Sequence, residues 1–322
     1  MPKKELLELL NKAVARELQV SIQYMLQHTK MEKILRKTKA ANILLDKTTY
    51  SVIGEELKNF AIEEMKHAGT IMERIYFLGG SATTKAAKPQ IGDTLRDFAT
   101  LGQKAEQEAL DLYRKIIDFA MKMGDWETSQ IFEKIYSDEE RHFFKFEEYL
   151  QIDITELDGP ESLPTDFREI FDEGYFALLN KAVAAEISAI IQYTNQHEKA
   201  SLLALRKKIT PLETITDSTK AQAVSKLLEK IFIQEMEHLE KISERIYLLE
   251  GECVYEPDPL PKVGDTADDF LRLDHKAEDE AIILYRKIIA EALKRGDTAT
   301  RRLFEDIVIE EEEHYWAFDD FF

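Results

Sequence analysis

The sequence predicts an all-α protein built from two four-helix bundles in tandem. Hydrophobic residues make up 44% of its 322 residues and charged residues 33%, with only 12 glycines and 8 prolines, which is typical of a helix-rich globular chain. Apolar residues recur at steps of three and four along extended stretches. The chain also repeats itself once, and its length suits two units of roughly 150 residues each.

The internal repeat defines the two units. Leu9 to Glu17 reads LLNKAVARE, and Leu178 to Glu186 reads LLNKAVAAE, 169 residues further on. Two more matching pairs of segments are 73–78 with 244–249 and 113–117 with 285–289. The repeat predicts one bundle over residues 1–152, an acidic linker with Gly and Pro over 153–169, and a second bundle over 170–322.

Each half is expected to hold four helices. The expected ranges are 4–38, 51–79, 93–124 and 126–150 in the first half, and 173–208, 218–250, 265–296 and 298–319 in the second. Gly79-Gly80 and Gly251 are expected to end the second helices, and Asp or Thr of a Gly-Asp-Thr sequence to cap each third helix. The Pro-containing segment between the second and third helices is long enough to cross the bundle, which predicts a one-crossover topology.

Charge and cysteine content exclude several classes of partner. The acidic excess, 62 Asp and Glu against 43 Lys and Arg, disfavours nucleic acid and anionic membrane surfaces and favours cations. No run of 18 apolar residues occurs, so no membrane-spanning helix is expected. The single cysteine, Cys253, cannot form an internal disulfide, which fits a reducing compartment, and a cytoplasmic location is expected.

A Glu-x-x-His motif occurs on the second and fourth expected helices of each half. Residues three apart share a helix face, so the carboxylate and the imidazole can bind one metal ion together. One such motif is a weak signal, whereas four on alternate helices of a duplicated chain are a strong one. The pairs are Glu64 with His67, Glu139 with His142, Glu235 with His238, and Glu311 with His314.

The first and third helices are each expected to supply one inward carboxylate. Glu17 and Glu186 end the repeated run among apolar neighbours, and a carboxylate there needs a partner because burying it alone is prohibitive. Four Glu and two His per half suit two iron ions, or manganese, rather than tetrahedral zinc. The candidates on the third helices are Glu106 and Glu278, and their rivals on a different face are Glu108 and Glu280.

At these residues the sequence resembles the bacterioferritin family over nearly all of both halves. The resemblance rests on EMKH at 64–67, followed by ERIYFL, on IGD at 91–93, and on DEERH at 138–142. It implies a ferritin-like bundle with a di-iron centre in each half. By this resemblance the bridging ligands are Glu64, Glu139, Glu235 and Glu311, the terminal ligands are Glu17, Glu106, Glu186 and Glu278, and each iron takes one His.

The resemblance also implies roles for two tyrosines and two methionines. Tyr24 and Tyr193 match a family tyrosine near the irons that could supply an electron, with a phenol packed in the core as the competing interpretation. Met65 and Met236 match the family's haem-ligating methionine, so the resemblance implies a haem between the halves, with plain core packing as the alternative.

The residues just before the bridging glutamates are expected to hold the histidines by hydrogen bonds. They are Glu63 and Asp138 in the first half, but Gln234 and Glu310 in the second. The uncharged Gln234 therefore predicts that the two sites differ.

Other departures concern the site surroundings and the assembly. Asp274 stands where the first half has Gly102. The chain ends eight residues after His314, without the family's short fifth helix, and its first-to-second helix connections are longer. These two departures disfavour a closed multi-subunit cage that stores mineral.

The leading hypothesis is a di-iron ferroxidase that oxidises Fe(II) to Fe(III) with O2 or H2O2, for iron detoxification or storage. The alternative is a rubrerythrin-like or di-manganese protein that consumes peroxide or O2 without storing mineral. The lack of a CxxC pair argues against a built-in rubredoxin domain. A non-catalytic iron or haem carrier is the third interpretation. We expect the two bundles to form an internal pseudo-dimer related by a pseudo-two-fold axis, with homo-oligomers as a further expectation.

Overall fold

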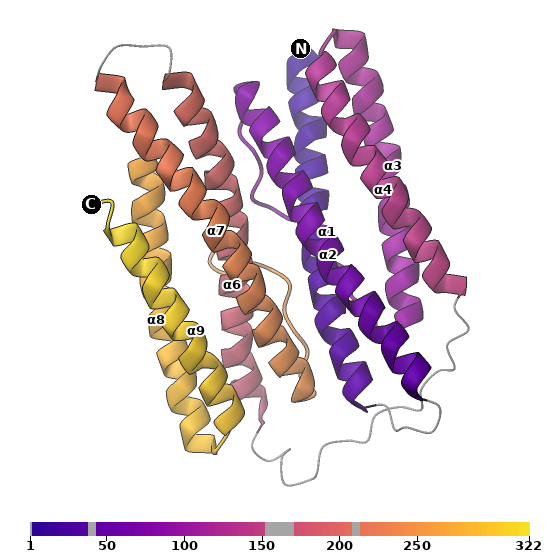
Figure 1. The fold of residues 1–322 in the computed structure, drawn as a ribbon, viewed down its shortest axis with the longest axis vertical. Helices are drawn as coiled ribbons and strands as arrows, with labels where there is room; N and C mark the ends of the chain where they lie inside the picture. Colours follow the sequence, from indigo (N-terminus) through magenta and orange to yellow (C-terminus); the bar gives the residue numbers. More distant parts are fainter. Residues whose placement is uncertain (1, 38–42, 152–170, 208–212) are drawn as a thin grey trace. The chain divides into compact units, whose positions relative to one another are not determined.

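The computed structural model describes residues 2–37, 43–151, 171–207 and 213–322. Within these ranges the chain forms eight α-helices and no strand, which confirms the all-α prediction (Figure 1). The first four helices are α1 (Pro2–Lys37), α2 (Ile43–Phe77), α3 (Leu95–Met123) and α4 (Trp126–Gln151). The last four are α6 (Glu173–Lys207), α7 (Glu213–Leu248), α8 (Ala267–Arg295) and α9 (Thr298–Asp319).

The helices belong to two compact units, Met1–Glu161 and Ser162–Phe322. The predicted linker over 153–169 lies outside the described residues, so its limits stay a prediction. The helices α2 and α7 begin at Ile43 and Glu213, several residues before the predicted starts at 51 and 218. These two stretches, 43–50 and 213–217, contain neither Gly nor Pro, so nothing in them prevents a helix.

Each unit is a bundle in which the first helix contacts the second and third, and the fourth helix contacts those same two. In the first unit α2 and α3 both run antiparallel to α1, so they run parallel to each other. A parallel pair requires the predicted crossing connection. The contacts that fix these directions are Ser21–Ala61 and His28–Gly54 for α1 with α2, and Tyr24–Glu106 and Glu17–Tyr113 for α1 with α3.

The crossing segment after α2 runs along α1 (Figure 1). The side chains of Asn11 and Gln23 accept hydrogen bonds from the backbone N–H groups of Thr83 and Gln90, at 2.6 and 2.9 Å. These side chains supply hydrogen-bond acceptors to backbone N–H groups in a segment that forms no helix or sheet. In the second unit the side chains of Asn180 and Gln192 accept hydrogen bonds from the backbone N–H groups of Val254 and Lys262 in the same way.

The helix ends follow the predicted signals with one exception. Thr94 caps α3 and accepts a hydrogen bond from the N–H three residues on, and Gly79 after α2 has a left-handed φ of 74°. The helix α7 ends at Leu248, just before Gly251, but the left-handed residue at this end is Glu250, with a φ of 68°. A larger residue at position 251 would clash, because a Cβ there would lie 2.4 Å from the ring of Phe176.

One stretch of α6, Glu173–Leu205, is long and apolar enough to cross a membrane by length and composition alone. Its most apolar part is 56% buried inside the protein, where α6 packs along α7 and carries the buried Glu186. Packing in a bundle core accounts for its apolar character.

Two helix glycines of the first unit allow a matched stability test. A Cβ at Gly102 would lie 2.5 Å from the buried ring of Phe146, whereas one at Gly54 would lie 3.6 Å from its nearest neighbour, His28. We expect Gly102→Ala to destabilise the protein by about 1–3 kcal/mol through overpacking. Gly54→Ala should stabilise it by about 1 kcal/mol through helix propensity. Thermal unfolding measures both changes, and a higher melting temperature for Gly102→Ala would contradict the packing described.

Candidate metal centres

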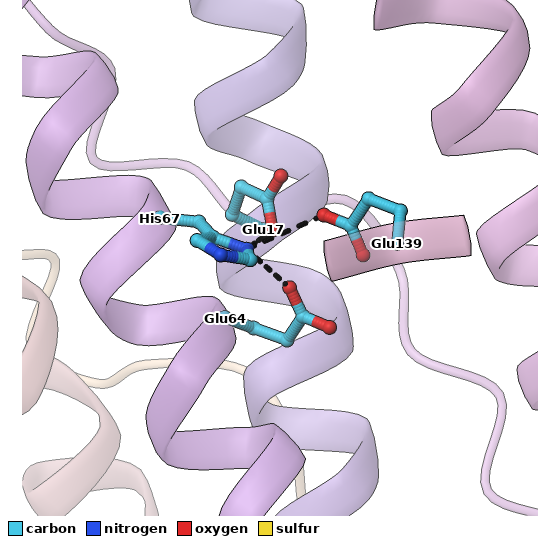
Figure 2. Close-up of side chains that lie close together, drawn as sticks. All are labelled: Glu17, Glu64, His67 and Glu139. Atoms are coloured by element: carbon cyan, nitrogen blue, oxygen red, sulfur yellow. Dashed lines mark hydrogen bonds and ion pairs between the residues drawn. The ribbon is translucent and has the colours of Figure 1, made fainter. Parts of the chain in front are cut away.

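Six ligand-type side chains converge at the centre of the first unit. One glutamate comes from each of α1 and α3, and a Glu-x-x-His pair comes from each of α2 and α4. Figure 2 shows four of them, Glu17, Glu64, His67 and Glu139, directed toward one another. All six are at most 7% exposed: Glu17, Glu64, His67, Glu106, Glu139 and His142.

Two carboxylates lie between two imidazole rings. Nδ1 of His67 is 3.0 Å from Oε2 of Glu64 and 3.3 Å from Oε1 of Glu139. Nδ1 of His142 is 2.9 Å from Oε1 of Glu64 and 3.4 Å from Oε2 of Glu139. Each of these carboxylates therefore presents one oxygen to each histidine, which is the geometry of a ligand shared by two ions.

Several of these polar atoms have no hydrogen-bond partner among the described residues. They include both carboxylate oxygens of Glu139, Oε1 of Glu64 and Nδ1 of His142. Nε2 of His142 lies 3.1 Å from a carboxylate oxygen of Glu63, and this contact would keep a proton on Nε2 and leave Nδ1 to face a metal ion. Carboxylates buried this deeply need positive charge beside them, and metal ions between the six side chains would supply it.

The second unit repeats this geometry with the equivalent residues. Nδ1 of His238 lies 3.0 Å from Glu235 and 3.1 Å from Glu311, and Nδ1 of His314 lies 3.1 Å from each of these carboxylates. Glu186 and Glu278 complete the set, and all six side chains are at most 4% exposed. The structure thus brings together all twelve predicted ligand side chains, six in each unit.

The four glutamates of the second unit's cluster form two pairs whose pKa values shift in opposite directions. Burial, then the charges of neighbouring Glu235 and Glu311, raises the pKa of Glu186 and Glu278 well above the ordinary value. Burial also acts to raise the pKa of Glu235 and Glu311, but the two imidazolium rings outweigh it and hold both pKa values below the usual range. Burial lowers the pKa of His314, and the carboxylates raise it to about 9. Without metal, two carboxylates are thus balanced by two imidazolium ions.

The rival glutamates lie outside the clusters. Glu108 forms an ion pair with Arg16 at 3.3 Å, and both Glu108 and Glu280 have exposed side chains. The choice of Glu106 and Glu278 over these rivals agrees with the geometry.

Four tyrosines donate hydrogen bonds to the outer carboxylates, and the sequence indicated only two of them. Tyr24 donates to Glu106, and Tyr193 donates to Glu278 at 2.6 Å. The other two belong to the repeated YRKII run, and their spacing of seven residues from the third-helix glutamate, two turns along the same face, could have indicated them. They are Tyr113, which donates to Glu17, and Tyr285, which donates to Glu186.

The contact outside one histidine differs between the units. In the first unit Glu63 accepts from Nε2 of His142 and is held by Arg141 at 2.6 Å. In the second unit Gln234 takes its place, and neither its side-chain oxygen nor Nε2 of His314 has a hydrogen-bond partner among the described residues. The other histidine of each unit keeps its acidic neighbour, with His67 Nε2 3.4 Å from Asp138 and His238 Nε2 2.9 Å from Glu310.

A second difference lies beside Tyr193. Asp274 is fully buried and accepts a hydrogen bond from Gln192 at 2.9 Å, whereas the ring of Phe146 fills this position beside Gly102 in the first unit. Burial raises the pKa of Asp274 well above its ordinary value.

Four helices with one crossover around a buried carboxylate and histidine cluster define the ferritin-like class. The ferritin-like domain family matches residues 7–153 and 176–322, and the chain belongs to this family. Its relatives include the bacterioferritin of Desulfovibrio desulfuricans, 32% identical over 45% of this chain and 74% of that protein. The bacterioferritin of Rhodobacter capsulatus is 35% identical over 38% of this chain and 67% of that protein.

A solved structure of the Desulfovibrio desulfuricans bacterioferritin, described with its diiron site in different catalytic states, covers 46% of this chain and 80% of that chain. It has 28% sequence identity and a TM-score of 0.40. The sequence relatives above each match less than half of this chain, and the family matches it twice, as a tandem pair of bacterioferritin-like bundles requires.

Metal uptake should release protons. At pH 7 the imidazoles of His67 and His314 are protonated without metal, because neighbouring carboxylates raise the pKa of His67 to about 11 and that of His314 to about 9. A metal ion must displace these protons, so apparent affinity should rise by about tenfold per pH unit for each proton displaced. A pH indicator in weakly buffered solution detects the release when Co(II) is added. Binding that does not change between pH 6 and pH 8 would contradict this linkage.

The Glu63 and Gln234 difference predicts unequal affinities. Gln234→Glu should tighten metal binding in the second unit, and Glu63→Gln should weaken it in the first, each by about tenfold or more, because the outer hydrogen bond orients the histidine. Competition with a coloured chelator for Co(II) measures both. Equal affinities of the two centres in the unmodified protein would rule out this role for Gln234.

Proposed function

We propose that each unit binds two Fe(II) ions as substrate among its four glutamates and two histidines and oxidises them to Fe(III) with O2 or H2O2. The observation that carries the proposal is the convergence of six buried ligand-type side chains in each unit, with polar atoms that no described residue satisfies. The bacterioferritin relatives support the same interpretation.

The proposed ligand roles follow the geometry of each cluster. Glu64 and Glu139 bridge the two ions, because each carboxylate faces both imidazoles. Glu17 and Glu106 each bind one ion from the side. In the second unit the bridging pair is Glu235 and Glu311, and the outer pair is Glu186 and Glu278.

The protein contributes to oxidation through charge and hydrogen bonding. A set rich in carboxylates stabilises Fe(III) more than Fe(II), because the harder and more highly charged ion gains more from anionic oxygen ligands, and this difference favours electron loss. Tyrosine hydroxyls hold the outer carboxylates in place. Tyr24 and Tyr193 remain proposed electron donors, because each hydroxyl contacts a ligand carboxylate directly.

Haem binding is a separate prediction, and no step of the proposed reaction passes through haem. The two predicted haem ligands, Met65 and Met236, are buried, with 1% and 3% of their surface exposed. Buried methionine is also adaptable core packing.

Removing one bridging ligand should inactivate one unit only. We expect Glu139→Ala and Glu311→Ala each to halve, roughly, the Fe(II) rapidly oxidised per chain, and the double variant to abolish it, because each unit holds its own complete set of ligand-type side chains. Stopped-flow absorbance of the ferric product after aerobic Fe(II) addition measures this. The matched controls Glu140→Ala and Glu313→Ala change exposed glutamates on the same helices and should have no effect.

Iron that binds to the unmodified protein but is oxidised no faster than in buffer would overturn the proposal. Repeated peroxide turnover with an external reductant and no retention of iron would instead favour the peroxide-scavenging alternative.

A further inference from the structure

An open pocket of about 310 Å³ leads to the cluster of ligand-type side chains in the second unit. It lies between α6 and α8, and every residue that lines it belongs to this unit. The lining includes four carboxylates of the cluster: Glu186, Glu235, Glu278 and Glu311. A molecule in this pocket can therefore reach the positions proposed for the metal ions without passing through the helix core.

Small apolar side chains form one part of the pocket wall, beside the carboxylates. They include Ala185 and Ala189 on α6, Ala281 and Leu284 on α8, and Pro259 of the crossing segment. The volume lies at the lower end of the range typical of small-molecule sites, and such sites combine apolar walls with a few polar groups. These features fit a small organic molecule that carries one reactive polar end.

In the first unit an arginine occupies the corresponding position. Arg16 is the one difference between the repeated runs LLNKAVARE and LLNKAVAAE, and it stands where the second unit has Ala185. Its guanidinium reaches from α1 to α3 and lies 3.3 Å from Glu108, the equivalent of the pocket residue Glu280. Arg16 is only 8% exposed, so its long side chain lies buried at the position where the second unit has the short Ala185.

We propose that the second unit admits an organic hydroperoxide to its metal pair, whereas Arg16 restricts the first unit to O2 and H2O2. The inference rests on the proposed function and names a substrate class for one of its two centres. The hydroperoxide accepts one electron from each of two Fe(II) ions and two protons from two water molecules, and its O–O bond breaks to give an alcohol and water, with two Fe(III) ions and two hydroxide ions as the other products. The alanine, leucine and proline side chains of the wall contact the organic group while the O–O end meets the cluster.

Exchanging the two residues tests the inference. The measured quantity is the rate of Fe(II) oxidation with tert-butyl hydroperoxide divided by the rate with H2O2. Ala185→Arg should lower this ratio by about tenfold or more through steric exclusion. Arg16→Ala should raise it to about twice the unmodified value, because two open sites replace one. The double variant should restore the ratio by moving the open site to the first unit.

Each substitution introduces the residue that the other unit has at the equivalent position, and a matched control is available. An arginine at 185 can pair with Glu280 as Arg16 pairs with Glu108, and an alanine at 16 reproduces the second unit's own sequence. Ala185→Ser keeps a small side chain and should leave the ratio unchanged. A ratio that does not respond to Ala185→Arg overturns the inference.

A second readout does not depend on oxidation. With Co(II) in both units, 2,2′-bipyridine should extract the cobalt of one unit at a rate that rises with bipyridine concentration, and the cobalt of the other unit more slowly. Ala185→Arg should remove the concentration-dependent phase, and Arg16→Ala should extend it to both units. If cobalt leaves both units at the same rate, and neither substitution changes that rate, the proposed access is wrong.

The two proposals fail in different ways. If H2O2 oxidises the iron and tert-butyl hydroperoxide does not, the proposed function stands and the substrate inference is wrong. If neither oxidant acts on bound iron, the proposed function fails and the substrate inference fails with it. If the organic oxidant acts equally in all variants, Arg16 and Ala185 do not control access.

Discussion

Eight glutamates buried in two helical bundles set the constraint on which the rest of the structure depends. Each is at most 2% exposed, and an isolated carboxylate cannot stay charged in such surroundings. Two imidazoles and two phenols lie against each set of four, and burial raises the pKa of the outer carboxyls. Cations satisfy the same oxygens more completely, so metal binding and the stability of the core are coupled.

The fold and most of the cluster could be predicted because their signals are local. Helical periodicity located the helices, and residues three apart on one face placed His67 beside Glu64 and His142 beside Glu139. Contacts between distant segments could not be predicted in this way. The hydrogen bond from Tyr113 to Glu17 joins residues 96 apart, and a tyrosine on an apolar face looks like ordinary core packing until the partner is placed.

The local sequence also does not fully explain the residues at helix ends. A glycine after a helix predicts a left-handed residue, which holds for Gly79 but not for Gly251, where Glu250 adopts that conformation. Close packing against Phe176 explains the glycine instead. The sequence pattern is the same for both causes, so only the neighbouring ring distinguishes them.

The two centres keep the same ligand types and differ in the residues around them, at Arg16 and Ala185, Glu63 and Gln234, and Gly102 and Asp274. Because both units are parts of one chain, they are synthesised in equal numbers whatever the level of gene expression. Two centres on separate chains could be made in any proportion and could assemble with themselves. Covalent linkage removes that freedom, so a pair of metal sites with different properties has a stoichiometry fixed at translation.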